Sequence, residues 1–153
     1  MKETCFFGEN CRINEIPGNF NTFEKNTVVK NDSRLGNCNT FGHDCTIGYR
    51  VMIGNCCNFE PNVEIEDDVY IGNNVTIASG VKIGKGCVIK SGATIKSNLG
   101  QYCKIAQNVV IERDVAIGDN VEIAPGCHIR RNDVVDSNFA VTEKRRVLMT
   151  PKD

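Results

Sequence analysis

The chain has 153 residues, of which 41% are hydrophobic, and its formal net charge at pH 7 is −1. This near-neutral charge excludes a general electrostatic attraction to nucleic acid or to acidic membranes. No stretch is long enough to span a bilayer, and the first residues do not resemble a signal peptide. We therefore expect a soluble, cytoplasmic protein without a nucleic-acid or membrane partner.

In chain order, a large hydrophobic residue recurs every six positions through most of the sequence. Repeats this short cannot bury their own apolar face, so successive units must stack on one another. The pattern predicts an all-β hexapeptide parallel β-helix in which three hexads make one triangular coil of 18 residues, with about seven coils in total. The recurring residues are Val29, Leu35, Phe41, Ile47, Ile53, Phe59, Ile65, Ile71, Ile77, Ile83, Ile89 and Ile95, followed by Leu99, Ile105, Ile111, Ile117, Ile123 and Ile129.

The fourth position of each hexad predicts the corners of the triangle. Gly, Asn and Asp dominate it, and these residues adopt the left-handed backbone region at low cost. Typical examples are Asn26, Asp44, Asn62, Gly80 and Asn108. The exceptions in the same frame are Cys38, Arg50, Cys56 and Tyr102.

Two breaks interrupt the period. Ile13 and Phe23 are ten residues apart, which predicts a short loop at Ile16-Pro17-Gly18-Asn19. Ile95 and Leu99 are four residues apart, which predicts a corner shortened at Ser97-Asn98.

The period ends near residue 133. We therefore expect a β-helix domain over residues 1–133 and a nonrepeating C-terminal arm over residues 134–153. This arm would add a strand that lies against the prism or against a neighbouring molecule.

The sequence contains nine cysteines, and most of them occupy the small inward position of a hexad. There a reduced thiol acts as a compact hydrophobic group, so we do not expect a disulfide scaffold. Cys38 and Cys56 differ because both fall on the same corner, one coil apart. A spacing of about 4.8 Å would permit a disulfide or half of a metal site. The next residue in that column, Asn74, is a poor third ligand, so we expect no metal.

Charge is uneven along the chain. Between Val69 and Ile111 there is no Asp or Glu, whereas the same stretch contains Lys82, Lys85, Lys90, Lys96 and Lys104. Such a belt of lysines is suited to the phosphates of a nucleotide-like cofactor. An equally simple interpretation is a solvated face that happens to be basic.

The segment from Glu64 to Ile89, EIEDDVYIGNNVTIASGVKIGKGCVI, closely resembles the C-terminal signature of the hexapeptide acyltransferases. These left-handed β-helix enzymes include sugar and antibiotic O-acetyltransferases and nucleotide-sugar N-acyltransferases. The resemblance implies a left-handed coil and a homotrimer with an acyl-CoA, here acetyl-CoA, between neighbouring prisms. The acceptor would be a hydroxyl or amine of a small molecule such as a sugar or nucleotide sugar. Ser79, Gly80, Lys82 and Lys85 would lie along the cofactor groove.

Acyl transfer requires a base, because the acceptor must lose a proton as it attacks the thioester carbonyl. An imidazole is suited to this step near neutral pH, and the chain has only His43 and His128. The resemblance favours His43, because Gly42-His43 stands near the place where the O-acetyltransferases carry a Gly-His motif. His128 is the second candidate, since it falls on an outward position of a flat face. For either histidine, the alternative is that it is an exposed polar residue without a catalytic role.

A second hypothesis comes from a different class of protein. The chain is also similar to the small pointed-end subunits of dynactin, which are β-helix scaffolds without catalysis, in its loop-poor prism and its Cys56-Cys57 pair. A γ-class carbonic anhydrase is excluded, because its zinc site requires three histidines. Tight binding of CoA would separate the acyltransferase from the scaffold.

Overall fold

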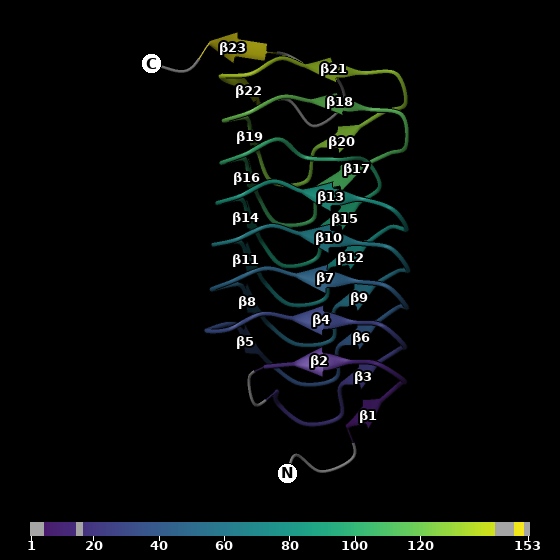
Figure 1. Cartoon of the computed structure of the whole chain (residues 1–153). Helices are drawn as coiled ribbons and strands as arrows, with labels where there is room; N and C mark the ends of the chain where they lie inside the picture. Colours follow the sequence, from purple (N-terminus) through teal and green to yellow (C-terminus); the bar gives the residue numbers. More distant parts are fainter. Residues whose placement is uncertain (1–4, 15–16, 143–148, 152–153) are drawn as a thin grey trace.

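The computed structural model describes residues 5–14, 17–142 and 149–151, and these residues form a left-handed parallel β-helix (Figure 1). The described residues contain strands and no helix, so none of them forms a helix that could cross a membrane. The chain rises from the N-terminus at one end of the prism to the C-terminus at the other. The predicted all-β architecture of about seven coils is confirmed.

Most coils contribute one short strand to each of three faces, which we name A, B and C. Face A contains β1 (Phe6–Phe7), β3 (Thr22–Phe23), β6 (Thr40–Phe41), β9 (Asn58–Phe59), β12 (Thr76–Ile77), β15 (Thr94–Ile95), β17 (Val110–Ile111) and β20 (His128–Ile129). Face B contains β2 (Arg12–Ile13), β4 (Val28–Val29), β7 (Thr46–Ile47), β10 (Glu64–Ile65) and β13 (Lys82–Ile83), and further along the axis β18 (Ala116–Ile117) and β21 (Val134–Val135). Face C contains β5 (Arg34–Leu35), β8 (Met52–Ile53), β11 (Tyr70–Ile71), β14 (Val88–Ile89), β16 (Lys104–Ile105), β19 (Glu122–Ile123), β22 (Phe139–Val141) and β23 (Met149–Pro151).

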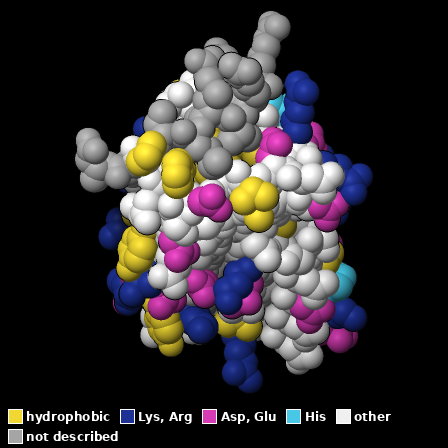
Figure 2. All heavy atoms as spheres, turned by 90° about the horizontal axis from the view of Figure 1, so that it is seen from above, with side chains coloured by type: hydrophobic (Ala, Val, Ile, Leu, Met, Phe, Trp, Pro, Cys, Tyr) yellow, Lys and Arg dark blue, Asp and Glu magenta, His cyan; other side chains and the backbone are white. Residues whose placement is uncertain are grey.

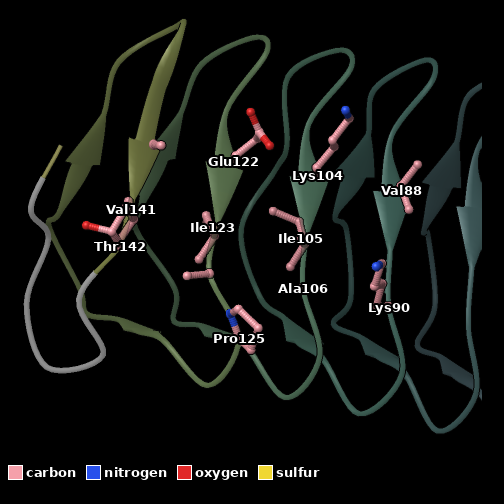
Figure 3. Close-up of a pocket in the computed structure, with 12 residues that line it drawn as sticks. Val88, Lys90, Lys104, Ile105, Ala106, Glu122, Ile123, Pro125, Val141 and Thr142 are labelled. Atoms are coloured by element: carbon pink, nitrogen blue, oxygen red, sulfur yellow. The ribbon is translucent and has the colours of Figure 1, made fainter. Parts of the chain in front are cut away.

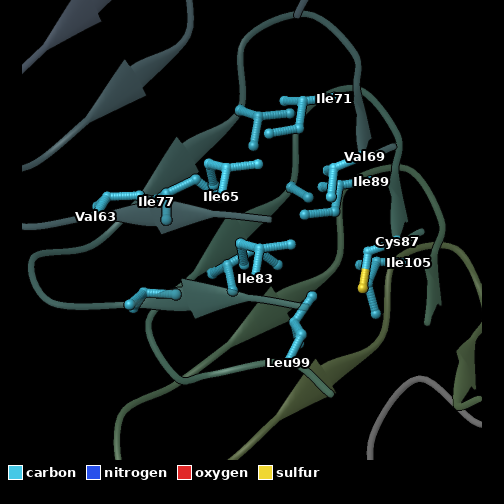
Figure 4. Packing of buried hydrophobic residues seen from close by; sticks show 14 of the residues in the cluster. Val63, Ile65, Val69, Ile71, Ile77, Ile83, Cys87, Ile89, Leu99 and Ile105 are labelled. Carbon is cyan, nitrogen blue, oxygen red and sulfur yellow. The ribbon is translucent and has the colours of Figure 1, made fainter. Parts of the chain in front are cut away.

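The predicted columns of large residues form the core of the prism. In most of the two-residue strands the first side chain points outward and the second points inward, as strand alternation requires. Figure 4 shows aliphatic side chains from the three faces meeting in the interior. Toward the N-terminal end the column of face A is aromatic, and the rings of Phe23, Phe41 and Phe59 stack with centroids 5.0 and 4.7 Å apart.

The corners adopt the left-handed conformation predicted from the sequence. The fourth-position asparagines and aspartates have φ between 55° and 69°, as in Asn120 and Asn132. Cys38, Arg50, Cys56 and Tyr102 adopt the same conformation, with φ values of 61°, 55°, 58° and 57°. Their place at the fourth position of a hexad therefore determines their backbone conformation, although residues of these types do not favour the left-handed region.

The prediction of a short loop at Ile16-Pro17-Gly18-Asn19 is wrong for Pro17, Gly18 and Asn19. Ile16 lies outside the described residues. The N–H of Gly18 donates to the carbonyl of Leu35 at 3.1 Å, as a regular coil requires. Phe20 follows as a left-handed corner with φ of 61°. Pro17 thus begins a normal hexad that leads to Phe23, and in the sequence Pro17 follows Ile13 by four residues.

The second break shows how such a shortening is accommodated. Leu99 makes only an isolated parallel bridge to Ile83, so face B is interrupted here. The side chain of Asn98 accepts the N–H of Lys82 at 2.8 Å, and Ser97 points inward and donates to the carbonyl of Glu112 at 2.6 Å. The side-chain oxygen of Asn98 thereby replaces a backbone carbonyl, whereas the bond of Ser97 is the one that Ser33 makes to Gly48 in a regular coil.

Parallel stacking continues beyond residue 133, where the β-helix domain was expected to end. β21 pairs with β18, and β22 pairs with β19, both in parallel register, and Val135 and Val141 are buried. β23 then pairs antiparallel with β22.

The stacked aromatic rings yield a prediction about stability. Phe41 is fully buried between two other rings, so Phe41→Ala should lower the free energy of unfolding by about 3–5 kcal/mol. Urea unfolding would measure the loss. Thr40→Ala, on the exposed side of the same strand, serves as the control and should change the value by less than about 0.5 kcal/mol. A small loss for Phe41→Ala would contradict the tight packing of the column.

Candidate functional site

His43 lies at the corner between faces A and B, directly after β6, and its side chain is partly exposed. Its Nδ1 lies 2.7 Å from Oδ2 of Asp44, and Oδ1 of Asp44 accepts a hydrogen bond from Nδ2 of Asn26 at 2.9 Å. The hydrogen bonds from His43 and Asn26 lower the pKa of Asp44 below its ordinary value of 3.8. Because an ionised carboxylate only accepts, Nδ1 of His43 carries a proton, and in the neutral ring the lone pair of Nε2 is available.

The fold itself produces this arrangement. Asp44 and Asn26 occupy the fourth position of hexads one coil apart, and both adopt the left-handed backbone, with φ of 61° and 63°. The N–H of Asp44 donates to the carbonyl of Lys25 at 3.0 Å, which fixes the two corners one above the other. The polar residues that favour a tight turn, Asn26 and Asp44, are thus stacked one above the other. His43 directly precedes Asp44 in the sequence and therefore lies beside this stack.

Two of the predicted cofactor-binding residues lie on the same corner as His43. The N–H of Asn62 donates to the carbonyl of His43, and the N–H of Gly80 to that of Pro61, both at 3.0 Å. Ser79 therefore lies two coils from His43, or about 10 Å along the axis. Its hydroxyl donates to the carbonyl of Pro61 at 2.8 Å.

The other two predicted cofactor residues lie farther around the prism. Lys82 is on face B, where its Nζ lies 3.3 Å from Oε2 of Glu66 and 4.0 Å from Oε1 of Glu64. Lys85 lies at the following corner and lines a polar cavity of about 280 Å³. The four predicted residues thus extend from the His43 corner across face B.

The five lysines do not form one belt. Each hexad turns the chain to the next face, so Lys82 lies on face B, Lys96 is paired with Glu112 at 3.5 Å beside face A, and Lys104 lies on face C. Neighbouring coils also supply carboxylates that the linear stretch lacks. In the view along the axis, basic and acidic side chains are mixed around the outline (Figure 2).

His128 lies on β20 of face A, in a separate cluster. Its Nε2 lies 2.6 Å from Oε2 of Glu112, whose other oxygen faces Lys96. The hydrogen bond from His128, with the charge of Lys96, lowers the pKa of Glu112 below its ordinary value of 4.5. Strands β9, β12, β15 and β17 separate His128 from the strand that precedes His43, so the two histidines do not share a site.

The sequence analysis missed a cavity of about 560 Å³ on face C (Figure 3). Its floor is apolar, and Lys104 and Glu122 lie at its edge. A signal was available, because small or apolar residues fill outward positions in four successive coils. These residues are Val88, Ala106, Ala124, Pro125 and Ala140. Neither His43 nor His128 lines the cavity.

In the part of the chain that the structure describes, no three His, Cys, Asp or Glu side chains come together in a way that could hold a metal ion.

The sequence matches the family described as bacterial transferase hexapeptide (six repeats) over residues 62–97 and again over residues 96–131. These matches run from β10 to β20 and meet at the second break. Residues 62–131 of the chain are therefore hexapeptide repeats of this family. Among curated proteins, no match was found.

Solved structures similar to this hexapeptide-repeat chain include three acyltransferases. UDP-N-acetylglucosamine acyltransferase from Campylobacter jejuni is 14% identical, with a TM-score of 0.39, over 94% of this chain and 69% of that one. A mutant perosamine N-acetyltransferase from Caulobacter crescentus, in complex with CoA and GDP-perosamine, is 14% identical, with a TM-score of 0.29, over 91% and 50%. A further UDP-N-acetylglucosamine acyltransferase is 16% identical, with a TM-score of 0.32, over 89% and 70%.

The cluster around Glu112 predicts a pH dependence of stability. A carboxyl group whose pKa is lowered by folding stabilises the protein above its unfolded pKa, and the effect is lost as the pH falls through the folded value. Wild type should therefore have a higher Tm than Glu112→Gln at pH 7, and the difference should shrink as the pH falls below 4.5. Thermal unfolding of both proteins across this range would measure it. His128→Gln, which removes the largest cause of the shift, should reduce the pH-dependent difference, and an unchanged difference would contradict the assignment.

Proposed function

We propose that this chain is a CoA-dependent acyltransferase that transfers an acyl group, in the simplest case acetyl, to a hydroxyl or amine of a small acceptor. The observation that carries the proposal is the hydrogen-bonded series from Asn26 through Asp44 to His43. It orients an imidazole at a partly exposed corner with Nε2 available as a base. The match of residues 62–131 to a family described as transferases is consistent with this chemistry.

His43 would remove the proton from the acceptor as the acceptor oxygen or nitrogen attacks the thioester carbonyl. Asp44 would stabilise the imidazolium that forms, because its carboxylate already faces Nδ1. When the tetrahedral intermediate collapses, the carbon–sulfur bond breaks, and His43 would return the proton to the departing thiolate. The protonation state of His43 is thus restored in each cycle.

The cofactor would lie along the corner above His43 and across face B. Ser79 and Gly80 would line its path at the corner, and Lys82 and Lys85 would contact its phosphates. Lys82 would exchange its ion pairs with Glu64 and Glu66 for a phosphate, at little cost because all three side chains are accessible to solvent. We extend the proposal to a cytoplasmic homotrimer, with the acyl-CoA between neighbouring prisms and a sugar or nucleotide sugar as the acceptor.

Titration calorimetry with acetyl-CoA and with CoA is the first test of the proposal. We expect micromolar binding at about one site per chain. If neither ligand binds, the acyltransferase proposal fails, and a scaffold without catalysis becomes the better explanation.

A second test removes the base. With acetyl-CoA and a panel of nucleotide sugars, His43→Ala should lower kcat by about 10²–10⁴-fold, because a general base contributes this much. Its affinity for CoA should not change. Product CoA is best measured by chromatography, because Cys38 and Cys56 are exposed and would react with thiol reagents.

His128→Ala is the matched control, since it removes an equally accessible histidine that also faces a carboxylate. Its turnover should equal that of wild type. If His43→Ala retains full turnover, or if His128→Ala loses it, the assignment of the base to His43 is wrong.

A further inference from the structure

Two of the nine cysteines are exposed, and they lie one above the other. Cys38 is at the corner between β5 and β6, and Cys56 is at the corner between β8 and β9, one coil further along the same edge of faces C and A. Cys45, Cys57, Cys87, Cys103 and Cys127 are buried, and Cys5 and Cys11 are partly buried. Exposure thus separates Cys38 and Cys56, the corner pair, from the other cysteines.

The backbone holds the corner pair at the spacing of one coil. The N–H of Cys56 donates to the carbonyl of Asn37 at 2.9 Å, and the side-chain oxygen of Asn55 accepts the N–H of Asn37 at 2.8 Å. The buried side chain of Asn39 accepts the N–H of Cys57 at 2.8 Å. A coil spacing of about 4.8 Å lies within the range of Cα separations that a disulfide spans, which is about 4.4–6.8 Å.

Packing does not explain why thiols occupy these two corners. Both residues adopt the left-handed conformation, with φ of 61° at Cys38 and 58° at Cys56, which is unfavourable for their side chains. The following left-handed corners of the same column are Asn74, Gly92, Asn108 and Gly126. Left-handed residues with exposed side chains are a reason to look for chemistry at that place.

We propose that Cys38 and Cys56 are a redox-active pair that closes to a disulfide between adjacent coils by exchange with a low-molecular-weight disulfide such as glutathione disulfide. One corner thiolate attacks a sulfur of glutathione disulfide and releases one glutathione thiolate, which gives a mixed disulfide. The second corner thiolate then attacks the protein sulfur of that mixed disulfide and releases the second glutathione. Two thiols and one disulfide thus become one protein disulfide and two molecules of glutathione.

The buried cysteines are poor competitors for this exchange. Burial raises the pKa of Cys45 to about 11 and also raises the pKa of Cys57, so these groups remain thiols at neutral pH. Their sulfurs also donate to backbone carbonyls, Cys45 to Glu60 at 3.2 Å and Cys57 to Gly72 at 3.0 Å. The nucleophile is the thiolate, so exchange should be confined to accessible cysteines.

The proposal does not depend on the acyltransferase. The corner pair lies on the edge between faces C and A, whereas His43 lies on the edge between faces A and B. Variants of the pair should therefore keep the basal properties of the protein, and failure of either proposal leaves the other intact.

The test treats the reduced protein with glutathione disulfide, blocks the remaining thiols, and maps the products by mass spectrometry after trypsin. Cleavage after Arg34, Arg50 and Lys82 places Cys38 and Cys56 in different peptides, 35–50 and 51–82. Wild type should lose the mass of two hydrogen atoms and yield these two peptides joined by a disulfide. A bond between Cys56 and Cys57 would remain within one peptide and would contradict the proposal.

Cys38→Asn and Cys56→Asn are the matched controls, because asparagine already occupies this column at Asn74 with φ of 56°. Each variant should lose the joined peptides and instead retain one glutathione on the remaining corner cysteine. The proposal is overturned if wild type stays unmodified or retains glutathione on both corners. It is also overturned if the joined peptides persist in either variant, since Cys45 or Cys57 would then take part in the bond.

Discussion

The structure depends on one backbone constraint, which is that the chain must turn through the left-handed region once in every hexad. Only then do successive coils superimpose so that N–H groups of the strands meet carbonyls of the next coil, as from Met52 to Val69 and from Tyr70 to Cys87. The strands between the turns are only two residues long in most coils, so no single strand could be stable alone. Stability is therefore a property of the stack, in which every unit relies on its neighbours.

Stacking also explains how the polar corner residues are satisfied. A side chain that favours the turn lies one coil from its equivalent, so its oxygen can accept an N–H from the adjacent coil. Asn37, Asn55 and Asn73 do this in succession, with distances of 2.8 Å from Asn37 to Asn55 and 2.9 Å from Asn55 to Asn73. The contact between Asn26 and Asp44 is a variation on this ladder in which the acceptor is charged. The environment of His43 thus follows from the regular architecture.

Much of the fold could be predicted from the sequence, because period and residue type determine it directly. The inward columns and the left-handed corners follow from the six-residue frame, including corners at residues as unsuited as Arg50 and Tyr102. The loop predicted at the first break was wrong, because the ten residues from Ile13 to Phe23 can be counted in two ways. They are either one hexad with an inserted loop of four residues, or a shortened unit of four followed by a hexad. The hydrogen bond from Gly18 to Leu35 and the left-handed corner at Phe20 distinguish these possibilities.

The candidate sites were less predictable, because their chemistry depends on neighbours at spacings of one coil. The lysines between Val69 and Ile111 lie in a stretch without acids, yet Lys82 meets Glu66 and Lys96 meets Glu112 from adjacent coils. Likewise, the sequence placed His43 and Asp44 side by side without indicating that Asn26 would hold the carboxylate. The apolar cavity on face C arises from outward residues of several coils, which no contiguous motif reveals.

A prism of this kind allows separate edges to carry separate chemistry. Residues on one edge are linked to each other through the corner ladder, whereas residues on different edges are separated by a packed core of aliphatic side chains. Substitutions on the edge of His43 and on the edge of Cys38 share no hydrogen-bond partner, so their effects should add. Within one edge, by contrast, Asn26, Asp44 and His43 form a single network and should not behave independently. The functional unit of this fold is therefore the column of equivalent positions along an edge. A local sequence motif contains the residues of only one coil in that column.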